Sequence, residues 1–158
     1  MKGFTLIELL IGIGIIALIA LGVRLNLLGG RSSADLTTAT AEVATLLREA
    51  QSRSATQSQN VAWGVHFDNV ATSTPFYALF YSAYTSATTI GRYPLPVDVQ
   101  FSTSSVAAGS FLEVTFAQIS GIPSASTSVN LLLTAGGRTS PMINSSTIFI
   151  NSPGLISY

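Results

Sequence analysis

The chain opens with a long apolar segment that carries a single charge. Residues 4–23 are twenty amino acids, and Glu8 is their only formally charged side chain. At about 1.5 Å of rise per helical residue, this run extends roughly 30 Å, the hydrocarbon thickness of a bilayer. We therefore expect residues 4–31 to form a membrane-spanning helix. A carboxylate is costly within lipid, so Glu8 is a candidate functional residue.

After residue 31 the pattern becomes that of an amphipathic helix. Residues 32–58 place apolar or small side chains at three- and four-residue steps, the spacing of one helix face. The predicted face consists of Leu36, Thr40, Val43, Leu46, Leu47, Ala50 and Ser54. Glu49 and Arg53, four residues apart, are expected to pair on the other side of the helix. This half of the helix should pack on a sheet.

Two adjacent glycines, Gly29 and Gly30, lie between the two halves of the predicted helix. Each costs about 1 kcal/mol of helix stability relative to alanine. We expect the helix to be most flexible here, with a break or local melting at the pair. A helix that continues from residue 4 to residue 57 would be about 80 Å long.

After residue 60 the apolar period shortens to two, the period of a half-buried strand. Trp63, Val65 and Phe67 alternate with small or polar residues, and residues 76–84 are apolar on both faces, as in a central strand. Further strands are expected at residues 97–101, 112–116, 129–133, 147–151 and 155–158, with turn signals at residues 68–69, 93–96, 108–109, 121–123, 136–137 and 153–154. The pattern predicts an α+β chain: a long N-terminal helix packed on an antiparallel β-sheet domain at residues 59–158.

Composition narrows the functional classes. Only 9% of the 158 residues are charged, with 7 basic and 7 acidic side chains, and no cysteine is present. A chain without a basic footprint is not expected to bind nucleic acid. The absence of cysteine excludes disulfides and thiol chemistry.

The first residues, Gly3-Phe4-Thr5-Leu6-Ile7-Glu8, resemble the leader of type IV pilins and type II secretion pseudopilins. The resemblance implies that a prepilin peptidase removes residues 1–3 by cutting between Gly3 and Phe4. It also implies that Phe4 becomes the N-methylated terminus and that Glu8 assists subunit assembly. The implied fold is pilin-like.

The same resemblance implies the location and the partners of the chain. A single-pass protein would lie in the bacterial inner membrane with its N-terminus cytoplasmic, and would then enter a periplasmic or cell-surface filament. Its expected partners are the prepilin peptidase, other pilin or pseudopilin subunits in a helical filament, and an inner-membrane assembly platform.

Three later segments resemble a GspH/FimT-like pseudopilin domain. They are a helix end with small residues and arginine at 50–53, a strand–glycine–proline step at 116–123, and a strand–glycine–strand ending at 148–156. Many major pilins have a C-terminal loop closed by a disulfide, and a chain without cysteine cannot form it. Both features favour a minor pilin or pseudopilin.

The residues offer little for catalysis or metal binding. His66 is the only histidine, and strand alternation places it opposite Trp63, Val65 and Phe67, so we expect it to face solvent. The acids are scattered, and no calcium-loop or phosphate-binding glycine spacing is present. We predict no catalytic residues, no metal, no cofactor and no enzymatic activity.

Alternatives to a minor structural subunit remain open. A major pilin would build the bulk of the filament, and a tip module would bind DNA or a surface, as in cell adhesion. Tyr77, Tyr81, Tyr84 and Tyr93 offer a stacking platform for sugar or single-stranded nucleic acid, although packing within the sheet is favoured. Some fimbrial T-like minor pilins bind DNA through arginines in the C-terminal tail, and residues 151–158 contain none.

Overall fold

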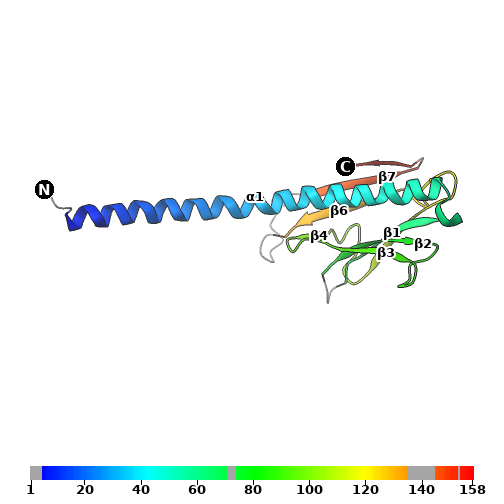
Figure 1. Ribbon diagram of the computed structural model, residues 1–158, viewed down its shortest axis with the longest axis horizontal. Helices are drawn as coiled ribbons and strands as arrows, with labels where there is room; N and C mark the ends of the chain where they lie inside the picture. Colours follow the sequence, from blue (N-terminus) through cyan, green and yellow to red (C-terminus); the bar gives the residue numbers. More distant parts are fainter. Residues whose placement is uncertain (1–4, 71–73, 135–144, 153) are drawn as a thin grey trace.

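The architecture is α+β, with one long helix lying along two antiparallel sheets (Figure 1). A computed structural model describes residues 5–70, 74–134, 145–152 and 154–158, and within them the side chains of all but residues 20–32. The N-terminal half of the helix extends away from the sheets, and its C-terminal half lies along them.

Helix α1 runs from Leu6 to Ala55 as one element of 50 residues. The predicted amphipathic face is confirmed, since all its members are buried, with 0% to 7% of each residue exposed: Leu36, Thr40, Val43, Leu46, Leu47, Ala50 and Ser54. The predicted pair is also present, with Arg53 Nη2 lying 2.6 Å from Glu49 Oε1. The second half of α1 is therefore the part that holds the domain.

The first half of α1 stands apart from the domain. None of its described side chains before Leu36 is buried. Among the residues that the structure describes, no helix has a stretch both long and apolar enough to span a membrane. The predicted span at residues 4–31 lies partly outside that description, because Phe4 and the side chains of residues 20–32 are not included.

The predicted antiparallel sheet domain is present, and its described strands form two sheets of four. One has the order β3-β2-β1-β5 and the other β4-β6-β7-β8. The strands of the first sheet are β1 (Trp63–Asp68), β2 (Phe76–Tyr81), β3 (Thr89–Pro94) and β5 (Phe111–Phe116). Those of the second are β4 (Val99–Phe101), β6 (Thr127–Leu133), β7 (Ser145–Asn151) and β8 (Leu155–Ser157). A short 3₁₀ helix, η1 (Ser58–Asn60), joins α1 to the first sheet.

Strand β3 differs from the sequence-based expectation, which placed a turn at residues 93–96. Every residue of β3 is exposed or half-buried, so the strand lacks the apolar alternation that marks a buried one. It lies at an edge of its sheet, where a proline such as Pro94 is tolerated because one side of the strand needs no ladder hydrogen bond. Strand β2 is confirmed as an interior strand, buried over five of its six residues.

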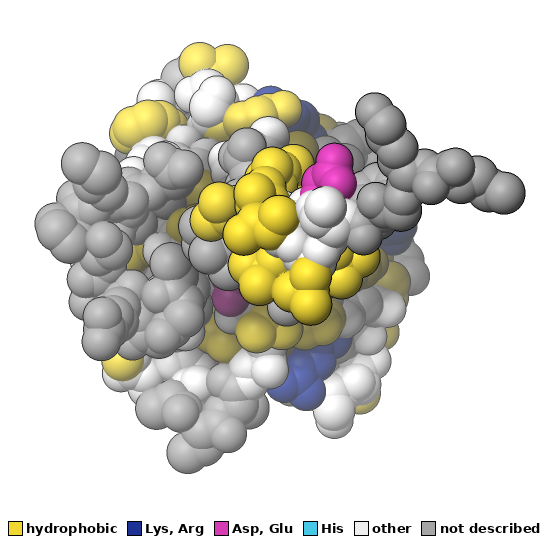
Figure 2. Space-filling model, turned by 90° about the vertical axis from the view of Figure 1, so that its left-hand side faces the viewer, with side chains coloured by type: hydrophobic (Ala, Val, Ile, Leu, Met, Phe, Trp, Pro, Cys, Tyr) yellow, Lys and Arg dark blue, Asp and Glu magenta, His cyan; other side chains and the backbone are white. Residues whose placement is uncertain are grey.

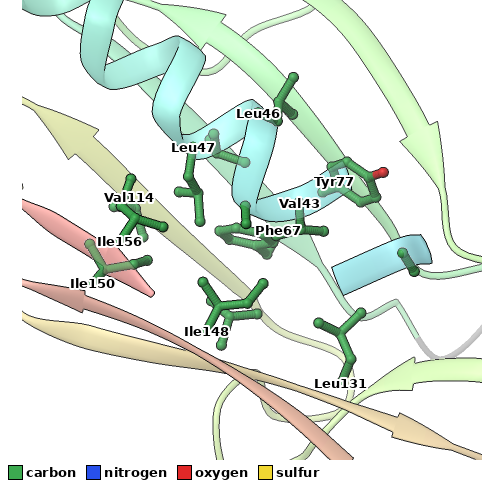
Figure 3. Close-up of a cluster of buried hydrophobic side chains, with 14 of the residues drawn as sticks. Val43, Leu46, Leu47, Phe67, Tyr77, Val114, Leu131, Ile148, Ile150 and Ile156 are labelled. Atoms are coloured by element: carbon green, nitrogen blue, oxygen red, sulfur yellow. The ribbon is translucent and has the colours of Figure 1, made fainter. Parts of the chain in front are cut away.

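The core fills the space between α1 and the two sheets (Figure 3). The helix contributes Val43 and Leu47, the first sheet contributes Phe67 and Val114, and the second contributes apolar side chains that include Ile148. Full burial of one such large apolar side chain stabilises the fold by about 1.5–3 kcal/mol. The core therefore fixes both sheets to the same helix.

A second set of contacts ties the end of the chain to α1. Gln51 Nε2 donates to the carbonyl oxygens of Gly121, at 3.1 Å, and Gly154, at 2.7 Å. Arg48 Nη2 donates to the Ile156 carbonyl oxygen at 3.1 Å. Gly154 has a φ of +103°, and a Cβ there would lie 2.5 Å from Gln51 Nε2, so only glycine fits. We call these contacts the Gln51 clamp.

Candidate functional site

The predicted site residues lie at the N-terminal end of α1. Gly3 and Phe4 fall outside the described residues, and Glu8 lies in the first turn of the helix. Thr5 is the N-cap, and its Oγ1 lies 3.4 Å from both the Glu8 backbone nitrogen and Glu8 Oε2. A threonine followed three residues later by glutamate is the capping-box spacing, a signal that the sequence analysis missed. The bond from Thr5 Oγ1 holds the Glu8 carboxylate near the helix N-terminus.

The surface around Glu8 is apolar. Ten large aliphatic side chains of the first half of α1 are between 53% and 80% exposed: Leu6, Ile7, Leu9, Leu10, Ile11, Ile13, Ile15, Ile16, Leu18 and Ile19. Figure 2 shows hydrophobic side chains gathered on the end of the molecule from which the helix protrudes. A contiguous exposed apolar surface of this kind marks contact with another protein or with lipid.

The backbone of α1 continues through Gly29 and Gly30. Their predicted flexibility stays a prediction, and it has a direct test. Replacing both with alanine should stabilise the local helix by about 2 kcal/mol. Amide hydrogen exchange at residues 27–33 of the full chain in detergent should therefore slow.

The matched control for this prediction is a second glycine pair on the same helix. Gly12 and Gly14 have no atom within 4 Å of a built Cβ, so alanine fits at both positions. Their double replacement should leave exchange at residues 27–33 unchanged. Equal exchange rates in the wild type and in the Gly29/Gly30 variant would contradict the predicted flexibility.

His66 does not face solvent, and the sequence-based expectation was wrong. Only 3% of the residue is exposed. Its ring does lie on the face opposite Trp63, but that face is covered: the Tyr84 ring stacks on His66 with centroids 3.6 Å apart. Nδ1 lies 3.0 Å from Glu113 Oε1 and Nε2 lies 3.7 Å from Asp68 Oδ2. Strand alternation identified the face correctly, but the covering residues come from distant parts of the chain.

The four tyrosines do not form one platform. Tyr77 and Tyr93 stack on each other with centroids 5.5 Å apart, Tyr81 tilts against Trp63, and Tyr84 stacks on His66. The buried Tyr77 hydroxyl donates to Glu42 Oε2 at 3.1 Å. Burial, followed by the charge of Glu42, raises the pKa of Tyr77 well above its ordinary value.

A groove of about 620 Å³ lies between α1 and the Tyr77–Tyr93 pair. Its lining includes the carboxylates of Glu42 and Glu49 and the hydroxyls of three threonines, Thr37, Thr38 and Thr45. Two carboxylates repel phosphate, so this groove does not suit nucleic acid. In the described part of the chain, no group of three or more acidic or histidine side chains is arranged to hold a metal ion.

Comparison with known proteins identifies the N-terminal segment. Residues 1–23 match the family model of the prokaryotic N-terminal methylation motif. Neither the curated proteins nor the solved structures contain a match to the chain. The matched residues include Gly3, Phe4 and Glu8, and the motif implies processing by a prepilin peptidase and assembly with other pilins. The chain thus carries, at its N-terminus, the class III signal of type IV pilin-like proteins.

Proposed function

We propose that this chain is a structural subunit of a type IV pilus or a type II secretion pseudopilus, and that it assembles through its N-terminal helix. One observation carries the proposal. The methylation motif lies at the free end of a single 50-residue helix, in which no described side chain before Leu36 is buried and one face from Leu36 to Ser54 is buried against the sheets. Such a helix can bundle with copies or relatives while the sheets stay outside.

The proposal includes a stage in the membrane. Before assembly, residues 4–31 span the bacterial inner membrane with the N-terminus in the cytoplasm. Afterwards the subunit belongs to a periplasmic or cell-surface filament, built on an inner-membrane assembly platform. The ten exposed aliphatic side chains between Leu6 and Ile19 support this, because lipid or neighbouring helices would cover them.

We place the chain among minor subunits of the GspH/FimT-like type. The three segments that carry this resemblance come together in space: Gln51, within residues 50–53, donates to the carbonyl oxygens of Gly121 and Gly154. A shared contact among the matching segments supports a common domain. The proposed role is structural, with no enzymatic activity.

The proportion of the chain in purified filaments tests the role. A minor subunit should be present in sheared filaments at a small fraction of the most abundant pilin, measured by quantitative mass spectrometry. A dominant proportion would identify a major pilin, and complete absence from filaments would contradict the proposal. For the tip-module alternative, a gel shift of the full chain in detergent at low salt should show no retained DNA.

A further inference from the structure

We infer that protonation of His66 controls whether residues 82–88 stay packed against the first sheet; we call this contact the His66 latch. In its charged form the imidazole donates to Glu113, lies within ion-pair distance of Asp68, and holds residues 82–88, here called the Tyr84 loop, over the outer face of the first sheet. The inference does not depend on the proposed function.

The two carboxylates flank opposite nitrogens of one buried ring. Nδ1 is 3.0 Å from Glu113 Oε1, and Nε2 is 3.7 Å from Asp68 Oδ2 but makes no hydrogen bond in the described structure. A neutral imidazole has a single N–H, so its bare nitrogen would direct a lone pair at one of these carboxylates. Only the imidazolium offers a donor on both sides. Each N–H of the charged ring would therefore face a carboxylate.

Both acids can stay charged beside the buried ring. The Glu113 side chain is 36% exposed and that of Asp68 is 20% exposed, whereas the His66 side chain is 4% exposed. The acids therefore keep part of their hydration while the imidazolium gains two counter-charges. A buried charge with such partners is tolerated, whereas one without them is costly.

The other elements around His66 add one positive charge. Strand register places Glu113, His66, Ala78 and Arg92 in one row across β5, β1, β2 and β3. Arg92 is separated from His66 by Ala78 and stacks on the Phe76 ring at 3.7 Å. From the loop, the only facing titratable group among the described contacts is the Tyr84 phenol. Two carboxylates therefore adjoin the ring, whereas the guanidinium belongs to a strand that does not pair with β1.

Tyr84 transmits this charge to the loop. Its ring lies parallel to the imidazole, with centroids 3.6 Å apart and planes 4° apart, and a cation on the face of a tyrosine is attracted to it. The Thr88 hydroxyl donates to the Ala83 carbonyl oxygen, and the hydroxyl of Thr89, the first residue of β3, donates to the Thr85 carbonyl oxygen. The loop is thus braced internally, so loss of the Tyr84 contact should release it as a unit.

His66 is the only histidine, so selective ¹⁵N-histidine labelling yields one pair of ring signals. The full chain in detergent, with any affinity tag removed, is titrated from about pH 5 to about pH 9, a range that includes the usual histidine transition. Both ring nitrogens should be protonated on the acidic side. As the pH rises and the ring loses its proton, amide exchange in the Tyr84 loop, corrected for its intrinsic pH dependence, should accelerate roughly tenfold.

The direction of the change in loop exchange with pH follows from the two N–H groups of the charged His66 ring. In the charged ring, both nitrogens direct an N–H toward a carboxylate, so protection of the loop is present at acidic pH and lost as the pH rises. A neutral ring at about pH 5, below the usual histidine transition, would overturn the inference. So would a ring that titrates while exchange in the loop stays constant.

Variants separate the latch from simple packing. The double change Glu113→Gln and Asp68→Asn keeps side-chain shape and removes both counter-charges, so the pH dependence of loop exchange should disappear. Glu49→Gln removes a carboxylate from a surface pair on α1 instead, and should leave that dependence intact. An unaltered dependence in the double variant would overturn the inference. Fluorescence of the buried Trp63 reports whether each variant is folded. If a variant is unfolded, the titration of the wild-type chain tests the inference by itself.

Discussion

Replacing Glu8 with leucine should exclude the chain from filaments while leaving it cleaved, inserted and folded. After cleavage at Gly3, Phe4 carries a free amine about one helical turn from Glu8. Within the apolar surface around it, an unpaired carboxylate costs about 2.5–3.5 kcal/mol, and pairing with the amine of a neighbouring subunit removes most of that cost. Without Glu8, the incoming subunit loses this favourable pairing, and its incorporation into filaments should fall roughly a hundredfold.

Incorporation is measured as the ratio of the chain in sheared filaments to that in membranes. Glu8→Gln is the matched variant, because it keeps an acceptor for the Thr5 hydroxyl but carries no charge. It should fail as the leucine variant does. If Glu8→Leu remains uncleaved, Glu8 serves as a peptidase recognition element. A leucine variant that is cleaved and assembles at the wild-type level would rule out both roles.

Replacing Gly3 with valine should abolish processing. The methylation motif at residues 1–23 places the scissile bond between Gly3 and Phe4. A β-branched side chain there restricts the backbone and occupies space beside the bond to be cut. Intact-mass analysis should find the variant still beginning at Met1, and the wild-type chain beginning at a methylated Phe4.

Gly12→Val is the matched control for processing. It introduces the same side chain at another glycine of the apolar segment, where nothing lies within 4 Å of a built Cβ. This variant should be cut normally. Wild-type chains in filaments that begin at Met1 would contradict the assignment of the cleavage site, as would normal processing of Gly3→Val.

The helix was predictable because its signals are local. A buried face repeats every three or four residues, so Leu36 through Ser54 could be identified from spacing alone, and each predicted member is buried. The motif around Gly3 and Glu8 is likewise contained in six consecutive residues. The cap by Thr5 was also readable from its spacing to Glu8, although it was not anticipated.

The features that escaped prediction depend on contacts between distant residues. His66 is buried because Glu113 pairs with it from 47 residues away and because Tyr84 folds back over it. The division into two sheets depends on which strand edges meet, and alternation within a strand does not encode that choice. Strand β3 escaped for a related reason, since an exposed edge strand leaves no apolar period.

The Gln51 clamp has a consequence for the order in which the protein forms. It joins α1 to Gly154, which lies 103 residues after Gln51 in the chain. The side chain of Ile156, two residues further on, belongs to the core. Contacts of such long sequence separation require closure of a large loop, and they slow folding. A nascent chain that has not reached residue 156 has no partner for Arg48 and no Ile156 side chain for the core. These contacts can therefore form only after residues 154–156 have left the ribosome, long after the N-terminal helix has emerged.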